Sequence, residues 1–228
     1  MKNKKQILLW DIDGTLLDTK GVGLNAIKFA INDIFQVEVI LQRKAFSGLT
    51  DHQIFYSILD ENFPQYLDEK HLSELIMRYE HYLAIVLKSE KPKVILNTFN
   101  NFVKLIQDKH FEHWIVTGNT FQGAKIKLRE AGYGSYFSDE VIFYSTKNEP
   151  RCEIIERAKR RFSNDSNQMI VIGDTPKDYE AAAEAKLKCI NIATGLHSYA
   201  ELNNLNPGLT LNDEWQISDL FYKLNSVN

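Results

Sequence analysis

The sequence is poor in the features that mark a secreted, membrane-spanning or nucleic-acid-binding protein. Its 228 residues include two cysteines, Cys152 and Cys189, which are too few for a disulfide framework or a cysteine-rich metal site. No apolar run approaches the roughly 20 residues needed to cross a bilayer, so we expect no membrane span. The formal net charge is −3 and the pI is about 6.1, which gives no reason to expect nucleic acid as a partner.

The beginning of the sequence also lacks the pattern of a signal peptide. Residues 1–5 are basic, but only the four apolar residues 7–10 stand between them and Asp11, and a signal-peptide core is longer than this. We therefore expect a cytoplasmic protein. Apolar residues make up 44% of the chain, enough for a full core in one large domain or in one domain with an insertion.

Short apolar runs alternate with amphipathic segments through most of the chain. The runs predict strands at residues 7–10, 114–116, 141–144, 169–172 and 189–192, with a possible short edge strand at 209–211. Amphipathic spacing predicts helices at 97–107, 122–131, 152–162 and 179–185, and a final helix at about 215–224. This alternation indicates an α/β protein: a Rossmann-like parallel sheet in three α/β/α layers, with right-handed crossovers.

Residues 17–92 interrupt the first crossover and carry no clear strand signal. Apolar spacing predicts helices at 22–35, from Thr50 or Asp51 onward, and at 71–87, so this block contains three or four helices. We therefore predict a core domain formed by residues 1–16 and 93–228. Residues 17–92, called the helical insertion below, would form a second domain over the carboxyl edge of the sheet.

Polar residues stand at the carboxyl ends of three predicted strands. They are Asp11 and Asp13 after the first strand, Thr117, Gly118 and Asn119 after the second, and Gly173, Asp174 and Asp178 after the fourth. Because these ends lie side by side in a parallel sheet, the four aspartates would crowd into one small volume. Like charges that close destabilise one another unless a cation lies among them. Carboxylate and carbonyl oxygens favour Mg²⁺, and such a site suits a phosphoryl group.

Each of these motifs alone is also compatible with an ordinary turn, but their ordered combination is far more specific. It resembles the haloacid dehalogenase-like hydrolase superfamily, in the branch similar to phosphoglycolate phosphatases, over essentially the whole chain. Residues 11–16 match the family's first motif, residues 115–119 the second and residues 173–178 the fourth. The helical insertion matches the family's small cap domain, and residues 47–51 resemble the cap loop that approaches the substrate.

The resemblance implies a Mg²⁺-dependent phosphatase acting on a small phosphate ester, such as a phosphoglycolate-like compound or a sugar phosphate. Asp11 would be the nucleophile and form an aspartyl-phosphate. Asp13 would protonate the leaving alcohol and then activate water, while its backbone carbonyl reaches the metal. The implied metal ligands are Asp11, Asp13, Asp174 and Asp178.

The same resemblance implies the substrate contacts. Thr117 and the N–H groups of Gly118 and Asn119 would hold the phosphoryl oxygens, and Thr50 would approach the substrate from the insertion. The family's third motif supplies a cation, usually a Lys, and here the sequence departs from the pattern. Lys147 and Arg151 are the two candidates. Arg151 is favoured, because some members begin the following helix with Arg.

Other functions remain open from the sequence. A sugar phosphomutase of the same fold would keep these motifs and pass the phosphoryl group to a second hydroxyl. A non-catalytic binding protein on this fold would be expected to lose a catalytic carboxylate, yet Asp11, Asp13 and Asp174 are all present. The exact phosphate ester, and the choice between monomer and homodimer, stay open.

Overall fold

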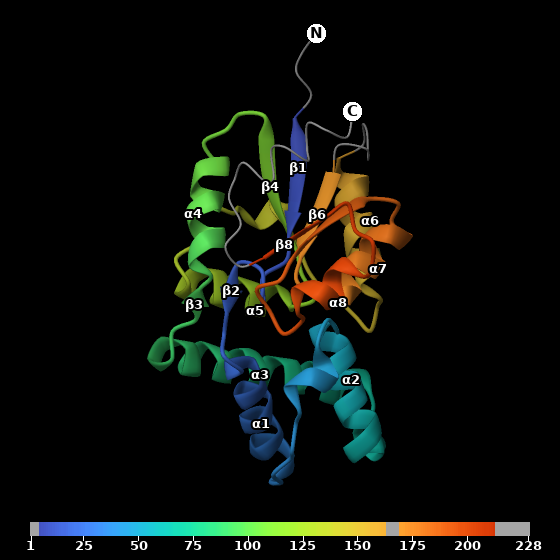
Figure 1. The fold of residues 1–228 in the computed structure, drawn as a ribbon. Helices are drawn as coiled ribbons and strands as arrows, with labels where there is room; N and C mark the ends of the chain where they lie inside the picture. The colour runs from blue at the N-terminus through green and yellow to red at the C-terminus, as the bar shows by residue number, and fades with distance from the viewer. Residues whose placement is uncertain (1–4, 163–168, 213–228) are drawn as a thin grey trace.

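A six-stranded parallel sheet forms the centre of the computed structural model, which describes residues 5–162 and 169–212 (Figure 1). The strand order is β5-β4-β1-β6-β7-β8, and every neighbouring pair is parallel. The strands are β1 Gln6–Trp10, β4 Phe111–Val116, β5 Ile142–Phe143, β6 Met169–Gly173, β7 Lys188–Ile192 and β8 Leu209–Leu211. The predicted α/β class with a Rossmann-like parallel sheet is confirmed.

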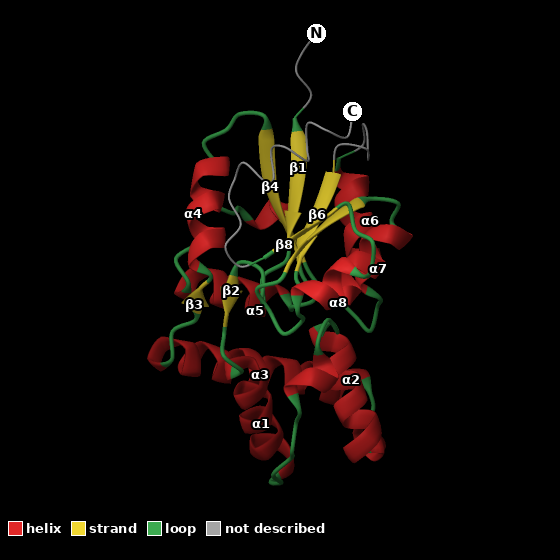
Figure 2. Ribbon diagram, viewed as in Figure 1, coloured by secondary structure: helices red, strands yellow, loops and turns green. Residues whose placement is uncertain are grey.

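Helices cover both faces of the sheet (Figure 2). They are α4 Leu96–Leu105, α5 Phe121–Glu130, α6 Arg151–Arg161, α7 Pro176–Glu184 and the short α8 Tyr199–Asn203. Side chains alternate between the two faces along a strand. Leu8 and Trp10 of β1 accordingly pack with α4 and α5. Ile7 and Leu9 pack with α6 and α7 on the opposite face.

Two details differ from the sequence predictions, and a third prediction is not tested. Leu17–Asp18 forms a short strand, β2, which pairs antiparallel with β3 (Lys93–Val94), so the insertion does begin with a strand. This two-stranded ribbon brings together the chain segments that enter and leave the insertion. Strand β5 is two residues long, shorter than the predicted run 141–144. The helix predicted at 215–224 lies outside the described residues.

Three helices of the insertion lie across the carboxyl ends of the sheet strands (Figure 1). They are α1 Val22–Phe35, α2 Asp51–Asn62 and α3 Glu69–Ser89, with short 3-10 turns at Arg43–Phe46 and Pro64–Tyr66. A second apolar cluster joins these helices and extends to Ile126 on α5. In the part of the chain that the structure describes, no helix combines the length and the apolar character needed to cross a membrane.

A buried Trp–His pair lies within the sheet. Trp10 Nε1 donates a hydrogen bond to His113 Nδ1 across 3.0 Å, and the two rings stack. Because an indole N–H can only donate, Nδ1 must accept, and the imidazole carries its single proton on Nε2. Burial lowers the pKa of His113 to about 4, since the charged form loses its hydration. Protonation would place a second donor against the Trp10 N–H.

This pair predicts an acid-sensitive contribution to folding. The pKa of His113 is about 4 when folded, whereas an unfolded histidine titrates near 6.5. The unfolded chain therefore binds more protons between these values, and the free energy of unfolding should fall as the pH drops from about 6.5 towards 4. We expect this histidine to account for a loss of about 2 kcal/mol at pH 5. His113→Gln should reduce that pH dependence in urea unfolding at pH 7 and pH 5, and equal pH dependence in both proteins would contradict the assignment.

Candidate active site

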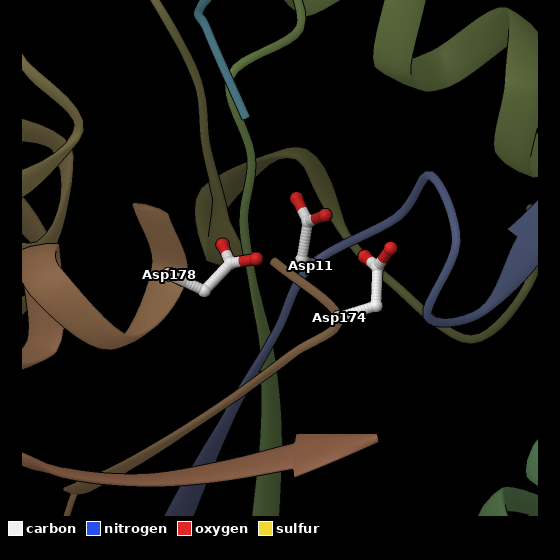
Figure 3. A group of neighbouring side chains, drawn as sticks. All are labelled: Asp11, Asp174 and Asp178. Carbon is white, nitrogen blue, oxygen red and sulfur yellow. The ribbon is translucent and has the colours of Figure 1, made fainter. Parts of the chain in front are cut away.

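Three aspartates converge at the carboxyl edge of the sheet (Figure 3). Asp11 follows β1, Asp174 follows β6, and Asp178 comes from the first turn of α7. Each offers a carboxylate oxygen, and the three oxygens lie within 4.8 Å of one another. The sequence argument that parallel strand ends bring these carboxylates together therefore agrees with the geometry.

The negative charges of the three carboxylates repel one another. Burial, together with Asp178 and Asp13, raises the pKa of Asp11 to about 7 although Arg151 opposes the shift. Burial and the neighbouring carboxylates also raise the pKa of Asp174. Asp11 Oδ1 is buried and has no hydrogen-bond partner among the described residues, although Arg151 Nη1 lies 3.4 Å away. A hard divalent cation would relieve the repulsion and use the unpartnered oxygen, so the residues present fit such an ion.

Two glycines make room for the Asp174 carboxylate. A Cβ atom at Gly195 would overlap Asp174 Oδ2, and one at Gly14 would overlap the same carboxylate. Gly14 also has a φ of +85°, which glycine adopts without the steric cost of a side chain. Thr15 Oγ1 donates to Asp174 Oδ1 across 3.2 Å and fixes its orientation. The first motif thus shapes the surroundings of the Asp174 carboxylate through its glycine and threonine.

Asp13 lies beside this group but makes a different set of contacts. Its Oδ2 accepts hydrogen bonds from Asn119 Nδ2 and Lys127 Nζ, each across 2.7 Å. Asn119 Nδ2 also donates to Thr117 Oγ1 across 2.8 Å, and Lys127 Nζ donates to Asn119 Oδ1. The carboxylate of Asp13 is thereby held by the residues that follow β4. The metal contact implied for Asp13 concerns its backbone carbonyl and stays a prediction.

Lys127 is the functional candidate that the sequence analysis missed. It lies on the buried face of α5, four residues after Gly123 and next to Leu128. Residues four apart share one face of a helix. A lysine on the core-facing side of the predicted helix 122–131 was the available signal.

Arg151 lies inside the site, whereas Lys147 is exposed. Arg151 begins α6 and forms ion pairs with Asp11 and Asp178, and its side chain is 10% exposed. Its Nη2 stands 3.0 Å from where a Cβ atom on Gly118 would be, so the guanidinium packs closely against the second motif. Arg151 Nε is a buried donor with no hydrogen-bond partner among the described residues. The guanidinium therefore keeps an N–H available for an anion.

The helical insertion contributes one wall of a cavity over these residues. The cavity has a volume of about 150 Å³. Its polar lining includes Asp11, Asp13, Asn119, Lys127, Arg151 and Asp174. The insertion adds a mixed wall, in which the charged residues Arg43 and Asp51 stand beside the apolar residues Leu24, Ile27, Phe46, Leu49 and Ile54. A small molecule that enters would meet the carboxylates at one end and the insertion at the other.

Hydrogen bonds tie the insertion to the core beside the cavity. Asp51 N donates to the carbonyl of Gly118 across 2.7 Å, and Thr120 Oγ1 donates to Glu80 Oε1 across 2.7 Å. The hydroxyl of Thr50 accepts the Gln53 N–H as the N-cap of α2. Thr50 is fully buried, whereas the neighbouring Leu49 and Asp51 line the cavity. The substrate contact implied for Thr50 stays a prediction. Thr50 thus positions the loop that reaches Gly118.

The chain is similar to known proteins in sequence and in fold. A family model described as "Haloacid dehalogenase-like hydrolase" matches residues 8–192. A protein of Dickeya dadantii named "Probable phosphatase IndB" is 24% identical over 89% of this chain and 87% of its own length. The crystal structure of a "predicted phosphatase" from Clostridium acetobutylicum is 23% identical, covers 98% of this chain and 100% of its own, and has a TM-score of 0.72. The structure of CbbY from Rhodobacter sphaeroides in complex with phosphate is 14% identical, covers 91% and 93%, and has a TM-score of 0.73.

Proposed function

Because the chain belongs to the haloacid dehalogenase-like hydrolases, we propose that it is a Mg²⁺-dependent phosphatase acting on a small phosphorylated metabolite. The observation that carries this proposal is the placement of Asp11. Its buried, unpartnered Oδ1 lies among two further carboxylates and the Arg151 guanidinium, at the floor of the cavity. A nucleophilic carboxylate needs an oxygen that no hydrogen bond occupies, and nearby positive charge stabilises the phosphoryl group that it attacks.

In the first step an ionised Asp11 oxygen attacks phosphorus, and the bond between phosphorus and the ester oxygen breaks. Asp13 gives its proton to the departing alkoxide, so that a neutral alcohol leaves. The product on the protein is an aspartyl-phosphate. Arg151 and the N–H groups after β4 would stabilise the charge on the phosphoryl oxygens.

In the second step water attacks the aspartyl-phosphate while Asp13, now ionised, accepts a proton from it. The bond between phosphorus and the Asp11 oxygen breaks, which releases inorganic phosphate and restores both carboxyl groups. Asp13 is near enough to serve both steps, because it follows Asp11 by two residues and lines the same cavity.

Asp11, Asp174 and Asp178 would hold the Mg²⁺ ion, together with the backbone carbonyl of Asp13. When bound, the ion supplies positive charge that offsets the negative charge of the carboxylates and of the phosphoryl group. Asp178 already forms an ion pair with Arg151 and a capping box with Thr175 at the start of α7. It would therefore either bind the ion directly or hold another ligand in place. The charge of the bound ion would favour the ionised form of Asp11, whose pKa burial otherwise raises to about 7.

The helical insertion would act as a cap domain that closes over the substrate and excludes water. The small volume of the cavity favours a compact leaving group. In this proposal the cap domain consists of residues 17–92, and the core domain consists of residues 1–16 and 93–228. The hydrogen bonds to Gly118 and Thr120 would form as the cap closes.

Metal binding should stabilise the fold, and Asp174 should be required for this effect. At a Mg²⁺ concentration 100 times the dissociation constant, the gain is about 2.7 kcal/mol, or about 5–10 °C in melting temperature for a chain of this size. Asp174→Asn should lose this gain, yet without metal it should melt no lower than the wild type, because the substitution removes a buried carboxylate whose pKa is raised. Thermal unfolding with Mg²⁺ and with EDTA measures both. An equal Mg²⁺ shift in the two proteins would contradict the assignment.

Phosphate release from a panel of small phosphate esters tests the function itself. We expect release with Mg²⁺ and none with EDTA. Rapid release without interconversion of sugar phosphates would exclude a phosphomutase. Mg²⁺ binding without turnover of any ester would instead favour a non-catalytic binding protein on this fold.

A further inference from the structure

A lysine is buried within hydrogen-bond distance of the Asp13 carboxylate. The Lys127 side chain is 6% exposed, which is unusual for an amino group with a long, flexible stem. A buried ammonium is costly unless charged or polar partners surround it. On the core-facing side of α5, the Lys127 ammonium therefore needs partners that compensate for its lost hydration.

The contacts of Lys127 explain how its charge is balanced. Nζ donates to Asp13 Oδ2 across 2.7 Å and to Asn119 Oδ1. Asn119 in turn donates to the same Oδ2 atom and to Thr117 Oγ1. The four residues form a closed network in which both ends of the Asn119 amide are used. The network fixes the orientation of the Asn119 amide and the Asp13 carboxylate together.

A second carboxylate faces Lys127 from the helical insertion. Asp51 is buried and accepts the Thr120 N–H through Oδ2 across 2.9 Å. Burial raises the pKa of Asp51 to about 6, and the positive charge of Lys127 opposes this rise. Thr120 is the N-cap of α5 and Lys127 lies about two turns further along the helix. Helix α5 therefore meets a carboxylate of the core and one of the insertion. Lys127 thus lies where the two parts of the molecule meet over the site.

We propose that Lys127 is a positioning residue for the hydrolysis, which holds the Asp13 carboxylate by Oδ2 and leaves Oδ1 as the oxygen that exchanges the proton. The proposal rests on the proposed phosphatase function. With Oδ2 engaged by two donors, rotation of the carboxylate is restricted. A misplacement of a reacting group by about 1 Å can cost about 10²-fold in rate.

The test compares Lys127→Met with Lys125→Met in the full-length protein with Mg²⁺. Lys125 lies on the same helix, but its side chain is 40% exposed and pairs with Asp139 on the surface. We expect Lys127→Met to lower kcat about 10²-fold with little change in KM, because Lys127 acts through Asp13. Lys125→Met should retain the wild-type rate. Lys127→Gln keeps a donor for Asp13 and should recover part of the loss. It also serves as the variant to read if Lys127→Met does not fold.

A double-mutant cycle separates this role from a structural one. If Lys127 acts only through Asp13, the double variant Asp13→Asn with Lys127→Met should be no slower than Asp13→Asn alone. If the rate losses of the two single variants multiply in the double variant, the proposal is overturned. A wild-type rate in Lys127→Met would also overturn it. Those outcomes leave the phosphatase function intact. A wild type that releases no phosphate from any ester would overturn the function and this inference together.

Discussion

Asp11→Asn should reduce phosphate release on the order of 10³-fold or more, to the background of the assay. The amide keeps the shape of the side chain but cannot attack phosphorus as a carboxylate does, so no aspartyl-phosphate can form. The fold should tolerate the change, because burial already disfavours the charge on Asp11 and raises its pKa to about 7. Release of inorganic phosphate, measured with Mg²⁺ at pH 7 beside a thermal melt, checks both expectations.

An exposed aspartate provides the control for this substitution. Asp139 pairs with Lys125 on the surface, and Asp139→Asn should leave the rate unchanged. If Asp11→Asn released phosphate at the wild-type rate, the reaction would not pass through Asp11. If Asp11→Asn lost both phosphate release and its cooperative melting transition, the substitution would have acted on folding instead.

The core of the candidate site was predictable because strand ends in a parallel sheet are neighbours whatever lies between them in the chain. Short apolar runs located β1, β4 and β6, and the polar residues that follow each run then had to meet at one edge. The apposition of Asp11 and Asp174, 163 positions apart in the sequence numbering, follows from this rule alone. Gly14 was recognisable as a turn, but its clearance for Asp174 depends on three-dimensional contact.

Other parts of the site were only weakly indicated by local patterns. Lys127 stands in a helix whose charged neighbours, such as Lys125, face solvent, and only the rotation of α5 against the sheet makes one lysine buried. The pairing of β2 with β3 joins two-residue segments that are too short to leave a period-2 pattern. In the sequence, Thr50 was a candidate both for the N-cap of a helix and for a substrate contact. In the structure its hydroxyl forms the N-cap of α2.

The sequence favoured Arg151 over Lys147 as the third-motif cation but did not decide between them. Both cations precede or begin the same helix, and a difference of four positions in a loop is too small to decide from pattern. The structure distinguishes them by burial: Arg151 pairs with Asp11 and Asp178, whereas Lys147 is exposed. The functional consequence of this difference is testable.

Arg151→Gln should lower kcat/KM by about 10²- to 10³-fold, with a rise in KM as part of the loss. The guanidinium offers its positive charge and an unpartnered Nε to an incoming phosphoryl group, and glutamine offers neither charge nor a fork of donors. The same change leaves three buried carboxylates without their cation, which typically costs about 3–5 kcal/mol. Mg²⁺ should restore part of that stability, because it would neutralise the same group. Steady-state kinetics and urea unfolding, each with and without Mg²⁺, measure the two effects separately.

Lys147→Gln is the matched control, since it removes the other candidate cation of the same connection. We expect kcat/KM within about twofold of the wild type and a change in unfolding free energy of about 0.5 kcal/mol or less. Arg151→Lys should fall between these extremes, because a single ammonium cannot contact Asp11 and Asp178 in the way the planar guanidinium does. A large loss in Lys147→Gln with a near-normal Arg151→Gln would reverse the assignment. It would mean that the loop carrying Lys147 closes over the site during turnover, and that Arg151 serves mainly to hold the unliganded carboxylates together.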